Sequence, residues 1–152
     1  MTATSHAIVG SVIAAKVGNP ALAIPIALAS HLVLDAIPHW DTATNGKNGT
    51  LGKKNGKVFI NTLLDFAIGL IASYFLLFFL FPTTNYIYAF IIIVCAQLFD
   101  WMTVPYLFLG MNSFFYKTYK FQKIFDRKLD KPWGIITQVV TVIAVIIIGK
   151  LI

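Results

Sequence analysis

Residues 57–81 read KVFINTLLDFAIGLIASYFLLFFLF, and nearly every side chain in this segment is apolar. A helix needs about 20 such residues to cross the hydrocarbon core of a bilayer, and this segment exceeds that length. Because lipid offers no hydrogen-bond partners to the backbone, an apolar segment of this length is expected to be helical. The segment therefore predicts an integral membrane protein.

The composition of the whole chain leads to the same interpretation. Of its 152 residues, 58% are hydrophobic and 12% are charged, and the mean hydropathy is +0.78. A soluble domain carries about 25% charged residues, so this chain has too few charges to cover a folded surface in water. We expect a single membrane domain over residues 1–152.

Glycine, proline and polar stretches divide the rest of the chain into further helices. Two short helices, over 4–17 and 20–37, are expected to form a tight hairpin in which Gly10 and other small side chains allow close packing. Another helix is expected from 86 to 104 or 109, and a last one over 133–152. The sequence thus predicts an all-α bundle of four to five helices.

The net charge of +6 is concentrated in two polar stretches, residues 47–57 and 117–131. Cation-rich loops that flank apolar segments lie on the cytoplasmic side of the membrane. We therefore expect a protein of the plasma (inner) membrane whose N-terminus is on the cytoplasmic side. Residues 112–131 interleave aromatic side chains with cations, a pattern typical of an amphipathic segment lying at the membrane interface. Such cations attract anionic lipid head groups. No motif for nucleic acid accompanies them, so the expected partner is membrane lipid.

Ionisable residues within the apolar segments are the candidates for function, because a charge inside a membrane is costly and is rarely kept without a role. The chain contains three His and six Asp but no Glu. Imidazole and carboxylate ligands together suit zinc, or another divalent metal such as manganese or iron. The residues that we expect to ligate this metal are His6, His31, Asp35, His39, Asp65 and Asp100.

Their spacing predicts that these side chains meet at one level of the bilayer. His31 and Asp35 are four residues apart and share a helix face. At 1.5 Å per residue, His31 lies ~10 Å and Asp65 ~12 Å from the cytoplasmic ends of their helices. Asp100 falls roughly 6–14 Å from the same side. A metal at this level would turn a bound water into a nucleophile near neutral pH. The catalytic residues would be Asp100, as a fifth ligand or the general base, and Asp41, which would orient a ligand or bind the metal itself.

Residues 30–41, SHLVLDAIPHWD, together with His6, resemble a family of small bacterial membrane proteins described as membrane-bound metal-dependent hydrolases. Asp65 and Asp100 look like further positions of that family. The resemblance implies a helical membrane protein with a divalent metal at the His/Asp cluster. More loosely, it suggests kinship with zinc-dependent phospholipase C and related nucleases, which also use a His-x-x-x-Asp pair on a helix. This chain has fewer histidines than those enzymes and can hold fewer metal ions.

The function that we expect is metal-dependent hydrolysis of a phosphoester or other lipid-linked bond at the cytoplasmic side of the membrane. Two alternatives stay open: a protein that translocates ions or protons, and a non-catalytic scaffold whose metal ties helices together. A translocator predicts polar residues through the outer half of the bilayer. Residues 71–81 are apolar apart from Ser73 and Tyr74, which favours a one-sided site.

Overall fold

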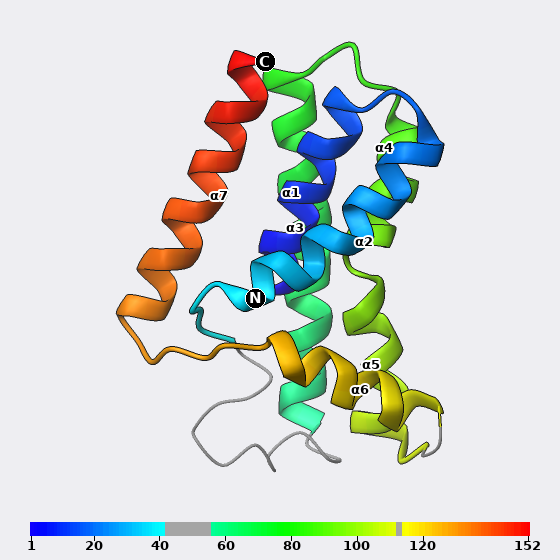
Figure 1. Ribbon diagram of the computed structural model, residues 1–152, viewed down its shortest axis with the longest axis vertical. Coiled ribbons are helices and arrows are strands. Elements are labelled where there is room, and N and C mark those ends of the chain that lie inside the picture. Colours follow the sequence, from blue (N-terminus) through cyan, green and yellow to red (C-terminus); the bar gives the residue numbers. More distant parts are fainter. Residues whose placement is uncertain (42–55, 112–113) are drawn as a thin grey trace.

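The computed structural model describes residues 1–41, 56–111 and 114–152. All regular elements among these residues are α-helices (Figure 1), which confirms the all-α prediction. The helices are α1 (Ala3–Lys16), α2 (Pro20–Ala36), α3 (Gly56–Leu80), α4 (Tyr86–Ala96), α5 (Leu98–Leu109), α6 (Phe114–Phe125) and α7 (Trp133–Leu151).

The predicted number of helices was too low because the helix expected over 86–109 is broken and the amphipathic segment forms a helix of its own, α6. The axes of α4 and α5 differ in direction by 52° at Gln97. Pro105, which follows the first of the two predicted ends of this helix, lies inside α5. The Gln97 side chain donates a hydrogen bond to the Ala3 carbonyl of α1 at 2.9 Å, so the bend is tied to a neighbouring helix.

Two helices, α3 and α7, are long and apolar enough to cross a membrane, and α4 with α5 could form a third, bent span. Their outward side chains are large and apolar: Phe75 is 62% exposed, Phe79 69% and Ile147 52%. In water such a surface would be unfavourable, whereas in lipid it is ordinary. The fold is therefore that expected of a membrane protein.

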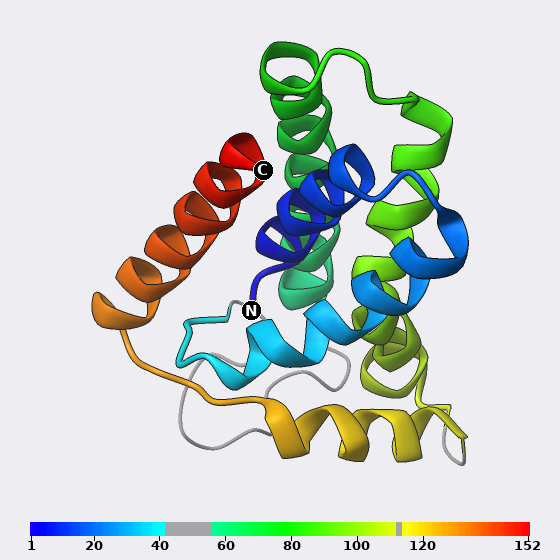
Figure 2. The ribbon, with the colours of Figure 1, turned by 45° about the horizontal axis from the view of Figure 1, so that its top comes forward.

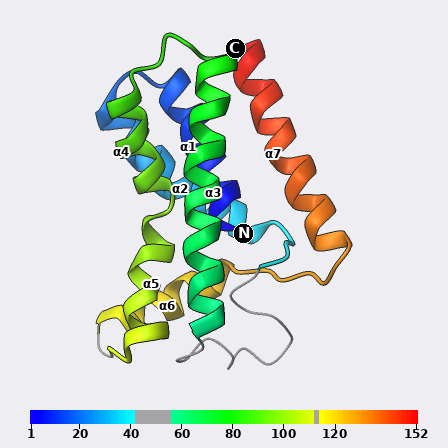
Figure 3. The same cartoon turned by 180° about the vertical axis from the view of Figure 1, so that it is seen from behind.

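The short helix α1 lies at the centre of the molecule. Seen from behind in Figure 3, α3 covers α1, with α7 on one side and α4 and α5 on the other. Glycines permit this close approach: a Cβ atom at Gly10 would lie 2.8 Å from Ala96 Cβ of α4, and one at Gly69 would lie 2.8 Å from Thr4 Cα. Gly10 therefore serves the contact of α1 with α4, whereas sequence analysis assigned it to the hairpin of the first two helices.

The Gly69→Ala variant is expected to be less stable than the wild-type protein by about 1–3 kcal/mol, the usual cost of overpacking. The added methyl group meets the backbone of α1 at Thr4, which cannot rotate away as a side chain could. Gly56→Ala in the same helix is the control, because no atom lies within 4 Å of the added Cβ there. Thermal unfolding in detergent measures both, and equal stabilities would contradict the packing of α3 on α1.

The end of the molecule opposite to the C-terminus is closed by α6, which runs across it (Figures 1 and 2). The chain after α6 pairs with the chain after α2, since the His39 N–H donates to the Arg127 carbonyl at 3.0 Å and the Leu129 N–H to the His39 carbonyl at 2.7 Å. The first turn of α3, with Lys57, lies at this same end. The rest of the basic stretch over 47–57 is outside the described residues.

Candidate metal centre

Three of the six predicted ligands form a group that could hold a metal ion. His6 of α1, His31 of α2 and Asp100 of α5 each offer a ligand atom, and these atoms lie within 4.8 Å of one another. Both imidazoles are fully buried and the Asp100 side chain is 23% exposed. The two imidazole rings stack with their centroids 3.9 Å apart.

Asp35 lies beside this group and joins the two imidazoles. Its Oδ1 atom is 3.2 Å from Nε2 of His6, and its Oδ2 atom is 3.3 Å from Nε2 of His31. The predicted one-turn pairing of His31 with Asp35 is thus confirmed. The ammonium group of Met1 also contacts Oδ1 of Asp35. Because its side chain is only 2% exposed, this carboxylate depends on these partners for the stabilisation that water would otherwise give.

The break between α4 and α5 orients His31. Because α4 ends at Ala96, the last carbonyls of this helix lack intrahelical partners. The Ala96 carbonyl lies 2.8 Å from Nδ1 of His31. A carbonyl can only accept, which assigns the ring hydrogen to Nδ1 and leaves the Nε2 lone pair directed at the cluster. Metal-binding histidines are commonly held in this way, by an N–H···O=C bond from the other ring nitrogen.

Gln122 of α6 reaches the same cluster, although sequence analysis did not single it out. Its amide nitrogen lies 3.1 Å from Nε2 of His31, 3.3 Å from Oδ2 of Asp35 and 2.8 Å from Oδ1 of Asp100. An amide group has two N–H bonds, so three acceptors compete for two donors. Gln122 is uncharged and lies in a helix that is polar along much of its length, so its sequence position gives no signal.

The residues present could hold a metal ion. Two imidazoles and a carboxylate are a common donor set for such ions. Nδ1 of His6 is buried and has no hydrogen-bond partner within the described part of the chain. A buried polar atom without a partner is costly. The cluster therefore has more acceptor atoms than donors: Nδ1 of His6 has no donor among the residues that the structure describes, and three acceptors share the Gln122 amide. A bound cation would satisfy the acceptors that are left over.

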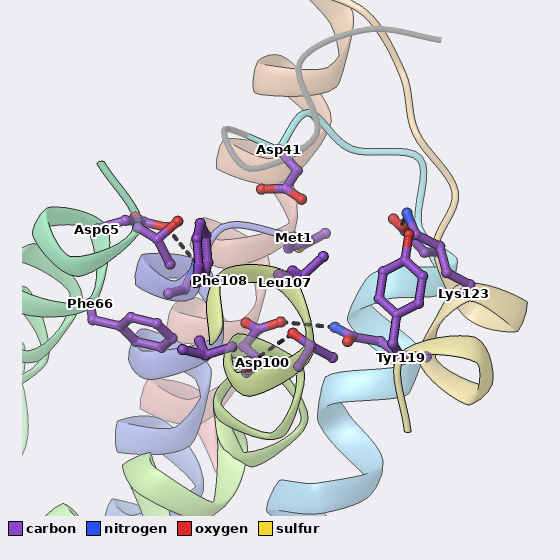
Figure 4. Close-up of a pocket in the computed structure, with 15 residues that line it drawn as sticks. Met1, Asp41, Asp65, Phe66, Asp100, Leu107, Phe108, Tyr119 and Lys123 are labelled. Carbon is purple, nitrogen blue, oxygen red and sulfur yellow. Dashed lines mark hydrogen bonds and ion pairs between the residues drawn. The ribbon is translucent and has the colours of Figure 1, made fainter. Parts of the chain in front are cut away.

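A cavity of about 70 Å³ adjoins the group, and Asp100 belongs to both. Figure 4 shows Asp41, Asp65 and Asp100 around this cavity, with Tyr119 and Lys123 on the side of α6. A space of this size can hold several water molecules or a small polar group. The cavity therefore brings carboxylates, a cation and a phenol next to the candidate ligands.

Asp65 lines the cavity but lies outside the group of three. Its carboxylate accepts hydrogen bonds from the Ala3 N–H at 2.7 Å and from the Thr4 hydroxyl at 2.6 Å. The first N–H groups of a helix have no intrahelical partner and carry the positive end of the helix dipole. The structure thus gives Asp65 a role in holding the start of α1, which accounts for a carboxylate in an apolar segment.

His39 also lies apart from the group, in a network of charges around Asp126. Nε2 of His39 is 3.3 Å from the Asp126 carboxylate, which also pairs with Lys123 at 2.6 Å and Lys128 at 3.5 Å. Burial raises the pKa of the Asp126 carboxyl, but the neighbouring His39 imidazole and the two lysines outweigh it and hold that pKa well below its ordinary value. Asp41 lies 3.7 Å from Lys128 and joins the same network.

The chain matches no protein-family model, no curated protein and no solved structure. The chemistry of the site follows from its own donors. His6, His31 and Asp100 can ligate a cation, and Asp35 and Gln122 can orient these ligands. The cavity beside them can admit a polar group.

Proposed function

We propose that this protein is a membrane-embedded, metal-dependent hydrolase of a phosphoester or other lipid-linked bond. The observation that carries the proposal is the convergence of His6, His31 and Asp100. They meet beside a cavity that is lined by carboxylates and by a lysine. A divalent ion on these ligands, zinc by the nature of the donors, supplies Lewis acidity and a bound water of lowered pKa.

The surrounding side chains have separate roles in this proposal. Asp35 lies between the two imidazoles, close to Nε2 of each, and its charge adds to the attraction of the site for a cation. Asp41, on the cavity wall, is the general base that accepts a proton from the attacking water. Lys123, which also pairs with Asp126 at 2.6 Å, and Tyr119 line the cavity from α6 and can donate hydrogen bonds to the anionic part of a substrate. A phosphoester matches this arrangement of cation, hydroxyl and carboxylates.

The proposed location is the bacterial plasma membrane, with the site on the cytoplasmic side. The lysines of α6 and Lys57 of α3 lie at the end of the molecule that contains the site, as the positive-inside rule requires of cytoplasmic segments. Membrane lipid is then the partner within reach. The resemblance of residues 30–41 to membrane-bound metal-dependent hydrolases supports the same proposal.

A non-catalytic metal scaffold is the second candidate, and the burial of the group favours it. His6 and His31 are inaccessible to solvent and come from different helices, so a shared ion would tie α1 to α2. In that case a metal would raise the unfolding temperature without supporting any turnover.

Turnover by the reconstituted full chain tests the proposal. Vesicles that contain phosphatidic acid, phosphatidylglycerol or cardiolipin are incubated with protein and Zn²⁺ or Mn²⁺, and released phosphate or head group is measured. We expect metal-dependent release that the Asp100→Asn variant loses and the His39→Gln variant keeps. Stoichiometric metal binding without release from any lipid would contradict the hydrolase and favour the scaffold.

A further inference from the structure

A groove of about 540 Å³ lies where the bent pair α4 and α5 passes α3. Figure 3 shows the three helices that line it, with α3 beside α4 above and α5 below. The groove is lined by apolar side chains of all three helices, among them Leu63 and Leu70 of α3, Phe90 and Val94 of α4, and Leu98 of α5. The bend at Gln97 therefore coincides with a hollow between helices that could span the membrane.

The groove has a buried floor and an exposed rim. On the floor, Ile93 is fully buried and Phe66 is 7% exposed. On the rim, Leu63 is 42% exposed and Phe90 is 46% exposed. An apolar hollow on the outer surface of membrane-spanning helices opens towards acyl chains rather than towards water.

The groove continues to the wall of the cavity beside the candidate metal centre. Phe66 lines both the groove and the cavity. Its ring stacks on that of Trp101, with the centroids 4.1 Å apart, and Trp101 directly follows Asp100 in α5. Phe66 thus belongs to the walls of both spaces, and Trp101 to the groove alone.

From this continuity we propose that the groove holds one acyl chain of an anionic phospholipid whose phosphate lies in the cavity near Lys123. The inference rests on the proposed function and narrows its substrate to a lipid bound by chain and head group together. Gln97, a polar residue of the lining, already donates its amide to α1, so it is not directed at a peptide backbone. The apolar walls match an acyl chain, and Lys123, which lines the cavity together with Asp100, matches an anionic head group held beside the candidate metal ligands.

Quenching of Trp101 by brominated lipid tests the inference. The full chain is reconstituted in phosphatidylcholine vesicles in a Trp40→Phe, Trp133→Phe background, in which Trp101 is the remaining tryptophan. Phosphatidic acid with one brominated chain is compared with phosphatidylcholine carrying the same chain, both at the same low mole fraction. We expect about fivefold enrichment of the anionic lipid at Trp101, equivalent to the ~1 kcal/mol that one cation contributes at an anionic head group.

Two matched variants locate the effect. Ala67 lines the groove from an exposed position on α3, so Ala67→Phe fills the groove without entering the core. The Ala144→Phe change adds the same ring at an exposed position of α7. The enrichment should disappear in the first variant and persist in the second. Equal quenching by both lipids in the parent protein, or an unchanged preference in Ala67→Phe, would overturn the inference.

The same preparations keep this inference separate from the proposed function. If the lipid preference is absent while metal-dependent release of phosphate or head group persists, the groove is not the chain site and the hydrolase stands. If the preference is present and depends on Ala67 but no lipid is turned over, the groove binds lipid and the hydrolase is wrong.

Discussion

Replacing His31 with Gln is expected to lower the affinity of the purified protein for Zn²⁺ or Mn²⁺ by at least about 100-fold. Loss of a partner that merely orients a ligand usually costs 10–100-fold, and His31 is itself a candidate ligand. Its Nε2 atom is held towards the cluster by the Nδ1–H bond to the Ala96 carbonyl. Glutamine has a comparable length but no imidazole lone pair. Elemental analysis after purification and calorimetric titration of the metal-free protein measure the loss.

His39→Gln is the matched control, because His39 is also fully buried but lies outside the group of three. Its metal affinity should stay within a few-fold of the wild-type value. Equal loss of metal in both variants would place the ion elsewhere, between the two histidines or in the network around Asp126. Retention of full affinity by His31→Gln would remove the candidate metal centre altogether.

The Asp35→Asn variant is expected to lose roughly 3–5 kcal/mol of folding stability, the usual effect of removing one partner from a buried ionic cluster. The carboxylate of Asp35 faces His6, His31, the Gln122 amide and the ammonium group of Met1. An asparagine side chain has one acceptor oxygen, and its amide would direct hydrogens at the Met1 ammonium or at the Gln122 amide, which already carry them. Denaturant unfolding in detergent, followed by circular dichroism, measures the change.

Asp130→Asn provides the comparison for that measurement. Asp130 is exposed, so the same chemical change should alter stability by less than about 0.5 kcal/mol. A loss of similar size in both variants would mean that detergent or net charge dominates the measurement. A stable Asp35→Asn variant would contradict the central position of Asp35 in the cluster.

The features that the sequence predicts well are those that depend on neighbouring residues. The long apolar segment over 57–81 corresponds to Gly56–Leu80, and that over 133–152 to Trp133–Leu151, because length and hydropathy alone define such helices in lipid. The His31–Asp35 pair followed from helical spacing, since residues four apart always share a face.

The features that the sequence does not predict depend on partners far along the chain. The bend at Gln97 is tied to Ala3, 94 residues away, and no local pattern specifies that contact. Asp65 looks like the other intramembrane carboxylates, but its partners are the first N–H groups of α1, which its own helix cannot indicate. Depth along each helix predicted that His6, His31, Asp100 and His39 lie at one level of the bilayer. The first three side chains do meet, but His39 lies apart from them, because depth does not specify the direction of a side chain.

The enclosure of α1 also has a consequence for how the protein is made. At 1.5 Å per residue its 14 residues extend ~21 Å, less than the ~30 Å of the hydrocarbon core. It is synthesised before α3, α4 and α7, the helices that surround it. The surroundings of this short helix, which bears His6, are therefore complete only after α7 has been synthesised, and the candidate metal ligands can assemble only when translation has passed α5.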